Sequence, residues 1–325
     1  MARQAPFYSP TNPLAGKSRL QAGSYNSWKS VVTICLCLLV AIAVVRADSF
    51  TIATYNIENY TVTDRMTPEG YRQDYPKPES EKTALRAVIH ALHADVLVLQ
   101  EMGPQPFLDE LQRDLAKQGD DYPHAILVDG PDPERHVAVL SKRAWKAVTP
   151  HPDLEFTYRG SMEKAKRGLL EVTFAAAGGD FTLWAVHLKS KLTEDDDAND
   201  PQSANLRAAE AMAVRRTILD EFPDPVSARF AILGDFNDGK GSKPVQDLLR
   251  QGRTNITYMV PATDSHGEVW TEFYAKQEIY SGFDHVLVSP GLRGAVRDNR
   301  AIIFDAPEVS LASDHRPVVV TLDFP

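Results

Sequence analysis

The chain has 325 residues, of which 43% are hydrophobic and 24% are charged, and its formal net charge is −9. This length suits one large domain or two small ones, and the composition is that of a soluble globular protein with a sizeable apolar core. The acidic balance argues against a protein that holds polyanions by a generally basic surface.

The first 47 residues differ in composition from the rest of the chain. They contain no Asp or Glu, and the 15-residue apolar run VVTICLCLLVAIAVV at 31–45 precedes Ala47, a small residue suited to cleavage. This pattern predicts a signal peptide with a long basic leader, and hence a secreted or periplasmic protein. The alternative is an uncleaved membrane anchor, which usually needs about 17 to 25 apolar residues. The basic residues of this segment are Arg3, Lys17, Arg19, Lys29 and Arg46.

Cleavage before Asp48 would change both the thiol content and the charge. Cys35 and Cys37 are the two cysteines, and both lie in the apolar run, so residues 48–325 contain none. An exported domain without disulfides depends on its core for stability, which a domain of this size can supply. Without the five basic residues of the leader, 30 Lys and Arg stand against 44 Asp and Glu, which is a net charge of −14.

From residue 50 onward, strand-like apolar runs alternate with segments of helical periodicity, without internal repeats or linkers rich in Gly, Ser or Pro. So many strands and so few helices favour two sheets packed face to face with helices outside. We therefore predict one mixed α/β domain over 48–325. The predicted strands are 50–57, 95–100, 124–129, 136–141, 168–175, 181–188, 229–234, 283–289 and 317–322, and the predicted helices are 79–93, 105–118, 203–221 and 243–250.

Polar side chains stand at the boundaries of six of these segments. In ILGDFND, residues 232–238, a run suited to a buried strand ends in Asp235, Asn237 and Asp238. Asp, Asn and Gly are ordinary turn residues, so one such strand end would mean little. Six of them together indicate a site, because sites are commonly built at the edge where strands emerge. The other five boundaries carry Asn56 and Glu58, Glu101, His187, Asp284 and His285, and Asp314 and His315.

The blocks YNIEN, LQEM, VHLKSK, GDFND, FDHVLVS and SDHRPV make the sequence resemble the endonuclease/exonuclease/phosphatase superfamily, to which deoxyribonuclease I belongs. The resemblance covers nearly all of residues 50–325, with the blocks in the family's order. It implies a deoxyribonuclease I-like fold, a four-layer α/β sandwich of two packed mixed β-sheets with outer helices. This fold agrees with the strand count reached from the apolar runs.

The resemblance also implies a divalent metal site. Glu101 would be the main ligand, with Asn56 and Glu58 beside it and Asp314 completing or flanking the site. Carboxylate and amide oxygens are hard ligands, so Mg²⁺ is the expected ion, with Mn²⁺ or Ca²⁺ as substitutes. A surface Glu that follows a strand needs no function, so Glu58 also has a purely structural explanation.

Five residues would act on the phosphate, according to the same resemblance. Asp235 and Asn237 would hold the attacking water, with Asn237 also donating to a phosphate oxygen. Asp284 would pair with His315 and favour its imidazolium form, so that His315 serves either as a base or as a cation beside the phosphate. His187 would contact the phosphate or assist the leaving group, and no covalent enzyme intermediate is implied.

Other features have competing explanations. His285 stands where relatives often carry Tyr, and we expect it to pack rather than react. KAKRG at 164–168 is expected to be a solvated turn, with a substrate phosphate contact as the alternative. Trp270 and Phe273 are expected in the core, with a platform for a base or a lipid as the alternative. TEDDDANDP at 193–201 lacks the Gly and Glu of an EF-hand and is expected to be a solvated loop.

These observations predict a secreted or periplasmic metal-dependent phosphoesterase that hydrolyses phosphodiester bonds, with a nuclease as the leading interpretation. The substrate would be nucleic acid or another phosphodiester, and the protein would be a monomer without an obligate protein partner. The alternative is an enzyme for phospholipid or phosphoinositide head groups, although no convincing exposed aromatic hairpin for membrane entry is found in the sequence. A non-catalytic binding protein on the same fold is the third reading, but it would be expected to have lost some of the matched polar residues.

Overall fold

The computed structural model describes residues 48–67, 69–191 and 198–325. From residue 48 onward they belong to one compact unit. The predicted leader at 1–47, with Cys35 and Cys37, lies outside the described residues, as does most of the acidic run at 193–201. No helix among the residues that the structure describes is long and apolar enough to cross a bilayer.

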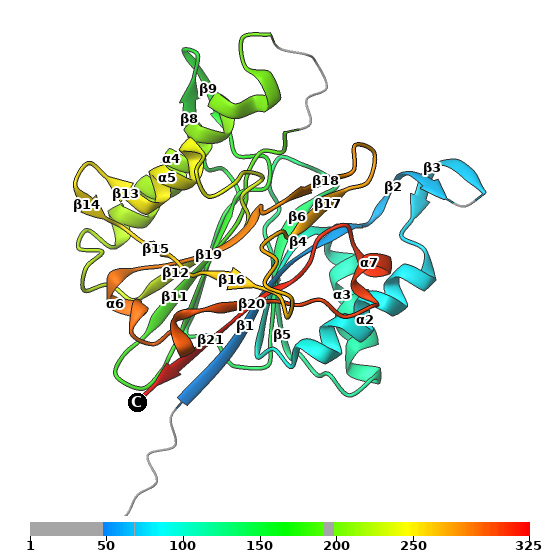
Figure 1. The fold of residues 1–325 in the computed structure, drawn as a ribbon, viewed down its shortest axis with the longest axis horizontal. Helices are drawn as coiled ribbons and strands as arrows, with labels where there is room; N and C mark the ends of the chain where they lie inside the picture. Colours follow the sequence, from blue (N-terminus) through cyan, green and yellow to red (C-terminus); the bar gives the residue numbers. More distant parts are fainter. Residues whose placement is uncertain (1–47, 68, 192–197) are drawn as a thin grey trace, which may run out of the picture. The chain divides into compact units, whose positions relative to one another are not determined.

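Two mixed β-sheets form the centre of the domain (Figure 1). All nine predicted strands are present, with small shifts at their ends, and each sheet gains short edge strands that the sequence did not reveal. The first sheet has the order β16(Ala262–Thr263), β20(Ala301–Ile303), β21(Val318–Phe324), β1(Asp48–Tyr60), β4(Val96–Met102), β6(His136–Ser141) and β5(His124–Leu127). The second has the order β15(Tyr258–Met259), β19(Asp284–Val288), β12(Phe230–Asp235), β11(Phe181–His187), β10(Leu169–Phe174) and β7(Ala147–His151).

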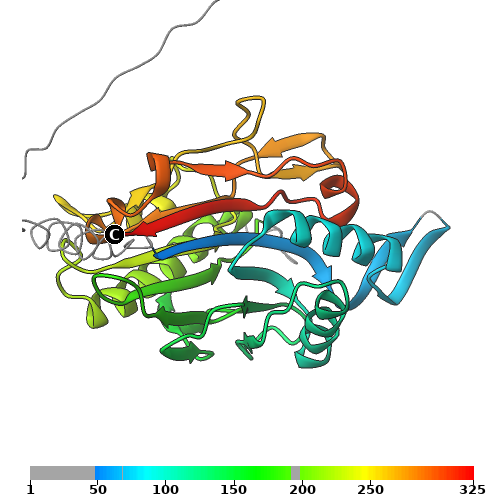
Figure 2. The same cartoon turned by 90° about the horizontal axis from the view of Figure 1, so that it is seen from below.

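The first and last long strands of the domain are neighbours. β1 pairs antiparallel with β21 from Asp48↔Phe324 to Thr54↔Val318 and parallel with β4 on its other side. Figure 2 shows β1 in blue beside β21 in red. This pairing joins residues more than 250 positions apart, so the complete described domain is needed to form the central sheet.

Four helices complete the four layers. α2(Glu79–Leu92) and α3(Gln105–Lys117) pack on the first sheet, and α4(Ala204–Glu221) and α5(Lys243–Leu249) pack on the second. All four helices begin and end within one residue of the predicted bounds. Short helical turns occur at η1(Pro201–Ser203), α6(Pro290–Arg293), η2(Arg297–Asn299) and α7(Val309–Ala312). The four-layer α/β sandwich is therefore confirmed.

Alternation along the central strands explains the layers. In β1, Phe50 and Ile52 face the core between the sheets, whereas Ala53 and Tyr55 face the core under the helices. Successive strand residues point to opposite faces, so a strand buried on both sides must be apolar throughout. The strands therefore appear in the sequence as unbroken apolar runs.

Glu210 on α4 is a buried carboxyl group near the end of β11. Its Oε2 accepts a hydrogen bond from Lys189 N (2.6 Å). Burial raises the pKa of Glu210 to about 7, against the lowering effect of that hydrogen bond and of the charges on Arg167, Arg207 and Lys189. The unfolded chain, with an ordinary value near 4.5, therefore releases this proton first as the pH rises.

Glu210→Gln is expected to stabilise the protein at pH 8 but not at pH 4.5. Between these values the folded state holds a proton that the unfolded state has lost, so wild-type stability falls as pH rises towards 7. The variant should gain about 2 kcal/mol in unfolding free energy at pH 8. Denaturant titrations at both pH values measure this, with Glu308→Gln at an exposed site as the matched control. An equal effect of Glu210→Gln at both pH values would contradict the prediction.

Four two-stranded hairpins extend the sandwich. The polar character of these segments hid them from hydrophobic patterning. They are β2(Val62–Thr67) with β3(Gly70–Pro76), β8(Glu155–Tyr158) with β9(Ser161–Lys164), β13(Arg250–Gln251) with β14(Thr254–Asn255), and β17(Glu272–Tyr274) with β18(Ile279–Ser281).

Candidate active site

Strand register brings three of the predicted residues into a row. β11 and β12 are parallel and pair His187 with Asp235, and the antiparallel β19 pairs Asp284 with Asp235. In the other sheet, the parallel strands β1 and β4 place Asn56 beside Gln100, so that Glu101 follows at the same edge. The two sheets therefore present their polar strand ends together.

Gly234 allows β11 and β12 to approach closely just before Asp235. Its φ is +147°, and a Cβ there would lie 1.9 Å from Val186 O. No other residue fits this position without moving a strand. The glycine of GDFND therefore sets the position of the aspartate that follows it.

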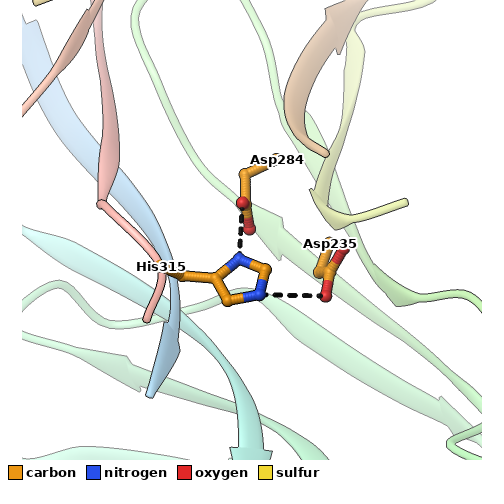
Figure 3. A group of neighbouring side chains, drawn as sticks. All are labelled: Asp235, Asp284 and His315. Atoms are coloured by element: carbon orange, nitrogen blue, oxygen red, sulfur yellow. Dashed lines mark hydrogen bonds and ion pairs between the residues drawn. The ribbon is translucent and has the colours of Figure 1, made fainter. Parts of the chain in front are cut away.

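His315 forms a buried charged pair with Asp284 (Figure 3). His315 Nδ1 donates to Asp284 Oδ2 (2.8 Å), and Nε2 lies 3.9 Å from Asp235 Oδ2. Burial alone would lower the pKa of His315, but the carboxylates of Asp284, Asp235 and Asp314 outweigh it and raise the pKa well above its usual value. His315 is thus an imidazolium at neutral pH, with Nε2 directed towards Asp235.

Asp235 is the most completely surrounded carboxylate of the site. Its Oδ1 accepts a hydrogen bond from Asn237 N (2.7 Å), and its Oδ2 accepts one from Asn56 Nδ2 (3.0 Å). Burial and the charge on Asp284 raise the pKa of Asp235 to about 7, although His315 and these hydrogen bonds act in the opposite direction. A carboxylate with a pKa near neutrality is suited to accept a proton from water.

His187 is buried beside Asp235 but carries no charge. Its Nε2 lies 3.6 Å from Asp235 Oδ2, and its Nδ1 has no hydrogen-bond partner within the described part of the chain. Burial lowers the pKa of His187 well below its usual value. Neighbouring positive charges add to this effect, and they lie on Arg167, His315, Arg135 and Lys189. The site therefore holds one cationic and one neutral histidine on either side of one carboxylate.

Glu58, Glu101 and Asp314 form a second acidic group, which we call the carboxylate cluster. Burial raises the pKa of Glu58 to about 7, with Asp314 and Glu101 adding to the effect and Lys77 opposing it. The side chain of Asp314 reaches solvent, but many protein atoms surround its carboxyl group. Their desolvating effect and the charge on Glu101 raise the pKa of Asp314, whereas His315 and Lys77 act in the opposite direction. The three carboxylates therefore repel one another.

The backbone of this cluster is strained. Glu58 has φ +46° and Glu101 has φ +61°, in the left-handed region that non-glycine residues seldom occupy. Asn59 N donates to Glu101 Oε2 (2.9 Å), and Asn56 Oδ1 accepts Glu58 N (3.1 Å). Repelling carboxylates held together by strained backbone fit a divalent cation, because hard oxygen donors are what such an ion binds.

Asp235, Asp284 and His315 also offer donor atoms within 4.8 Å of one another. His315, however, carries its Nδ1 proton towards Asp284 and is held in the charged form, and a charged imidazole is not a metal ligand. The carboxylate cluster is therefore the better fit for a cation, and this trio is better suited to moving protons.

The sequence as a whole matches a model described as the endonuclease/exonuclease/phosphatase family, over residues 53–315. The chain belongs to this family. The protein is accordingly a hydrolase of phosphate ester bonds, in a family that typically uses a divalent metal. No curated protein matches the sequence.

Solved structures of the endonuclease/exonuclease/phosphatase family share the fold. An endonuclease/exonuclease/phosphatase from Bacteroides vulgatus is 16% identical with a TM-score of 0.58, covering 86% of this chain and 100% of its own. Sphingomyelinase C from Streptomyces griseocarneus is 17% identical, with a TM-score of 0.57 and coverage of 85% and 99%. The human nocturnin catalytic domain with bound sulfate is 15% identical, with a TM-score of 0.58 and coverage of 86% and 98%. At these identities the similarity shows the fold.

Two predicted site residues also make contacts within the protein. Asn237 Nδ2 donates to Leu188 O (3.0 Å) and Asp235 Oδ2 (3.2 Å), so its amide orients Asp235. Asn56 likewise uses Nδ2 on Asp235 and Oδ1 on Glu58 N, so it links the carboxylate cluster to the proton-moving trio. Contacts of Asn237 with a phosphate and of Asn56 with a metal stay predictions.

Packing explains His285, as predicted. Its Nε2 lies 2.9 Å from Asp238 O, and its ring contacts Phe236 edge-on. Trp270 and Phe273 are half-buried in a cluster with Tyr280, which stacks on Phe273 with ring centroids 4.5 Å apart. The expectation that both belong to the core is therefore wrong.

Ser313 is a residue of the site that sequence reasoning missed. Its Oγ donates to Asn56 O (2.8 Å) and accepts a hydrogen bond from His315 N (3.0 Å), which ties β1 to the segment before β21 that carries His315. The one sequence signal that could have pointed to Ser313 is its position as the first residue of the SDHRPV block. Glu272 was also missed, and it forms an isolated β-bridge with His315 that joins β17 to the site.

Glu101→Gln is expected to raise the concentration of Mg²⁺ needed for half-maximal activity by about tenfold or more. Gln keeps the shape of Glu101 but removes the anionic oxygen that a hard cation prefers. Hydrolysis measured over a Mg²⁺ titration checks this, with Glu308→Gln at an exposed site as the matched control. Wild-type activity of Glu101→Gln at limiting Mg²⁺ would show that Glu101 is not a ligand.

Proposed function

We propose that this protein is a secreted or periplasmic, Mg²⁺-dependent phosphodiesterase whose substrate is a nucleic acid. The observation that carries the proposal is the pairing of Asp235, whose pKa is raised to about 7, with His315, whose pKa is raised well above its usual value. A base and a cation held side by side at the edge of two sheets are what hydrolysis of an anionic ester requires.

In the proposed reaction, Asp235 accepts a proton from the attacking water as the new P–O bond forms and the bond to the leaving oxygen breaks. His315 Nε2–H donates to a non-bridging oxygen, where negative charge increases. Asp284 accepts the hydrogen bond of Nδ1–H and so orients the charged His315 ring, which leaves Nε2–H for this contact. A divalent cation at the carboxylate cluster supplies positive charge for the leaving oxygen when bound.

Mg²⁺ is the ion we propose, because the donors of the carboxylate cluster are all oxygen atoms. Mn²⁺ and Ca²⁺ prefer the same donors and are proposed as substitutes. A titration of activity with each of the three ions compares them.

Nucleic acid is favoured as the substrate by the cations around the reaction centre. Arg135, Arg167 and Lys189 are close enough to His187 to affect its pKa. They place positive charge locally in a chain that is acidic as a whole. We propose a monomer without an obligate protein partner.

A lipid head group is the second candidate substrate, and a specific observation supports it. The sequence revealed no convincing exposed aromatic hairpin, but Tyr280 on β18 is 58% exposed and Tyr71 on β3 is 60% exposed. Met66, opposite Tyr71 in the β2–β3 hairpin, is 79% exposed. Exposed aromatic and apolar side chains of this kind can enter a membrane interface. One of the structurally similar proteins is itself named a sphingomyelinase C.

Export is proposed from the apolar run at 31–45 and from Ala47 after it. Mass spectrometry of the protein from its natural host measures where the mature chain begins. A chain that starts at or near Asp48 supports cleavage, and one that retains Cys35 and Cys37 supports the membrane anchor instead.

One experiment tests the proposed reaction and separates its substrates. The purified protein is incubated with plasmid DNA, RNA, sphingomyelin vesicles and phosphoinositide vesicles, each with Mg²⁺ and with EDTA. Mg²⁺-dependent cleavage of DNA or RNA that is absent in the His315→Ala variant supports a nuclease. Cleavage of lipids alone supports the second candidate, and binding without hydrolysis would support a non-catalytic protein on this fold.

A further inference from the structure

Arg167 is a buried cation with unused hydrogen-bond donors. The residue is only 8% exposed, and within the described residues its Nε and Nη1 have no hydrogen-bond acceptor. Asp132 Oδ2 lies 3.2 Å from Nε, which makes an ion pair without a hydrogen bond. Buried donors without acceptors are costly, so such a side chain suits a ligand that completes it. The predicted solvated turn is therefore wrong at Arg167, although its neighbour Lys166 is exposed.

The backbone around Arg167 is closely fitted. Gly168 has φ +66°, and a Cβ there would lie 2.7 Å from a Val128 side-chain atom. Gly130 lets the preceding loop approach, because a Cβ on it would lie 2.9 Å from Lys166 O. Asp132 N donates to the same carbonyl oxygen (2.8 Å). Arg167 is thus held in place before any ligand binds.

Arg135 has a position in the first sheet like that of Arg167 in the second. β6 begins next to the end of β4, where Met102 pairs with His136, and Arg135 directly precedes β6. β10 begins next to the end of β11, and Arg167 precedes β10. β6 also packs against β10 and β11 across the sandwich. Both arginines therefore lie one strand beyond the strand ends that carry Glu101 and His187.

Asp132 connects these two arginines. Its Oδ1 accepts Glu134 N (3.0 Å) and Arg135 N (3.2 Å), and its Oδ2 faces Arg167 Nε. Arg135 Nε donates to Asn59 Oδ1 (2.7 Å), and Asn59 N in turn donates to Glu101. A continuous chain of contacts therefore joins the two arginines to the carboxylate cluster.

We propose that Arg167, assisted by Arg135, binds a second phosphate of the substrate, next to the phosphate that is hydrolysed. The inference rests on the proposed phosphodiesterase function and defines its substrate class. A guanidinium presents a planar fork of donors that matches phosphate oxygens, and charge-assisted bonds of this kind are strong. A nucleic acid strand and a phosphoinositide both carry a second phosphate, whereas sphingomyelin carries one.

The test compares pairs of substrates that differ by one phosphate. One pair is a thymidine dinucleotide with a single phosphodiester and the same dinucleotide with an added terminal phosphate, at the 5′ or the 3′ end. The other pair is vesicles of phosphatidylinositol and of its ring-phosphorylated derivative. For the full-length wild type, the second phosphate is expected to raise kcat/KM by about tenfold or more in one pair. The pair that responds identifies the source of the phosphate.

Arg167→Ala is expected to reduce this gain to about twofold or less. Lys166→Ala removes the same charge from the same turn at an exposed position, and it should retain the full gain. Arg167→Lys keeps the charge but not the fork, so its gain should be intermediate, and it serves if the alanine variant does not fold. Thermal unfolding of each variant verifies folding.

Hydrolysis without any gain from the second phosphate in either pair would overturn this inference alone. An undiminished gain in Arg167→Ala, or in Arg167→Lys where the alanine variant is unfolded, would do the same. Absence of hydrolysis of every substrate would instead overturn the proposed function, and the inference with it.

Discussion

Replacement of His315 by alanine is expected to lower kcat by about 10³-fold with little change in KM. His315 is the buried cation nearest to Asp235, and its charge would stabilise the phosphate most strongly as negative charge develops. Steady-state kinetics on the best substrate measures the loss. His93→Ala, at the exposed C-cap position of α2, is the matched control and should behave like wild type.

Asp284→Asn is expected to lower kcat by about 10²-fold or more and to shift the alkaline limb of the pH profile to lower pH. In the wild type, Asp284 is the main charge that holds the pKa of His315 well above its usual value. Its removal lowers that pKa, so His315 loses its proton, and activity falls, at a lower pH than in the wild type.

The double variant should be little worse than His315→Ala alone, because Asp284 acts through His315. Additive losses, or an alkaline limb in Asp284→Asn that stays where the wild type has it, would show that the two side chains do not work together. Asp305→Asn provides a control for the same chemical change at an exposed position.

Asp235→Asn is expected to lower kcat by about 10³-fold and to abolish the acid limb of the pH profile. Burial and Asp284 raise the pKa of Asp235 to about 7, so the wild type should gain activity as the pH rises through about 7 and Asp235 ionises. Asn keeps the shape and cannot accept the proton from water.

A pH–rate profile from pH 5 to 9 measures this limb. Asp220→Asn on the exposed face of α4 is the matched control. An Asp235→Asn enzyme with reduced activity and the same acid limb would assign that limb, and the role of base, to another residue.

Much of the fold could be predicted because its central strands are buried on both faces. Runs such as DVLVLQ and RFAILG leave few alternatives to a core strand. The short strands β16 and β20 were missed, since two or three residues leave no periodic pattern. The strand β7 and the hairpins were missed because their segments are not apolar runs. Those elements exist because a neighbouring strand offers them hydrogen bonds, which is a long-range property.

The sequence by itself determined the residue types of the site, because each polar side chain ends or begins an apolar strand and the blocks keep their order. Which strands are neighbours was decided by tertiary structure, and that pairing alone puts His187, Asp235 and Asp284 in one row. Charge state also depends on surroundings. Two histidines with the same intrinsic pKa become one cation and one neutral ring, because three carboxylates raise the pKa of His315, whereas burial and neighbouring cations lower the pKa of His187. Arg167 looked like part of a solvated turn, and only packing against residues 128–132 shows it to be a buried donor. Burial and neighbouring charge are sums over residues distant in the chain, which local sequence does not contain.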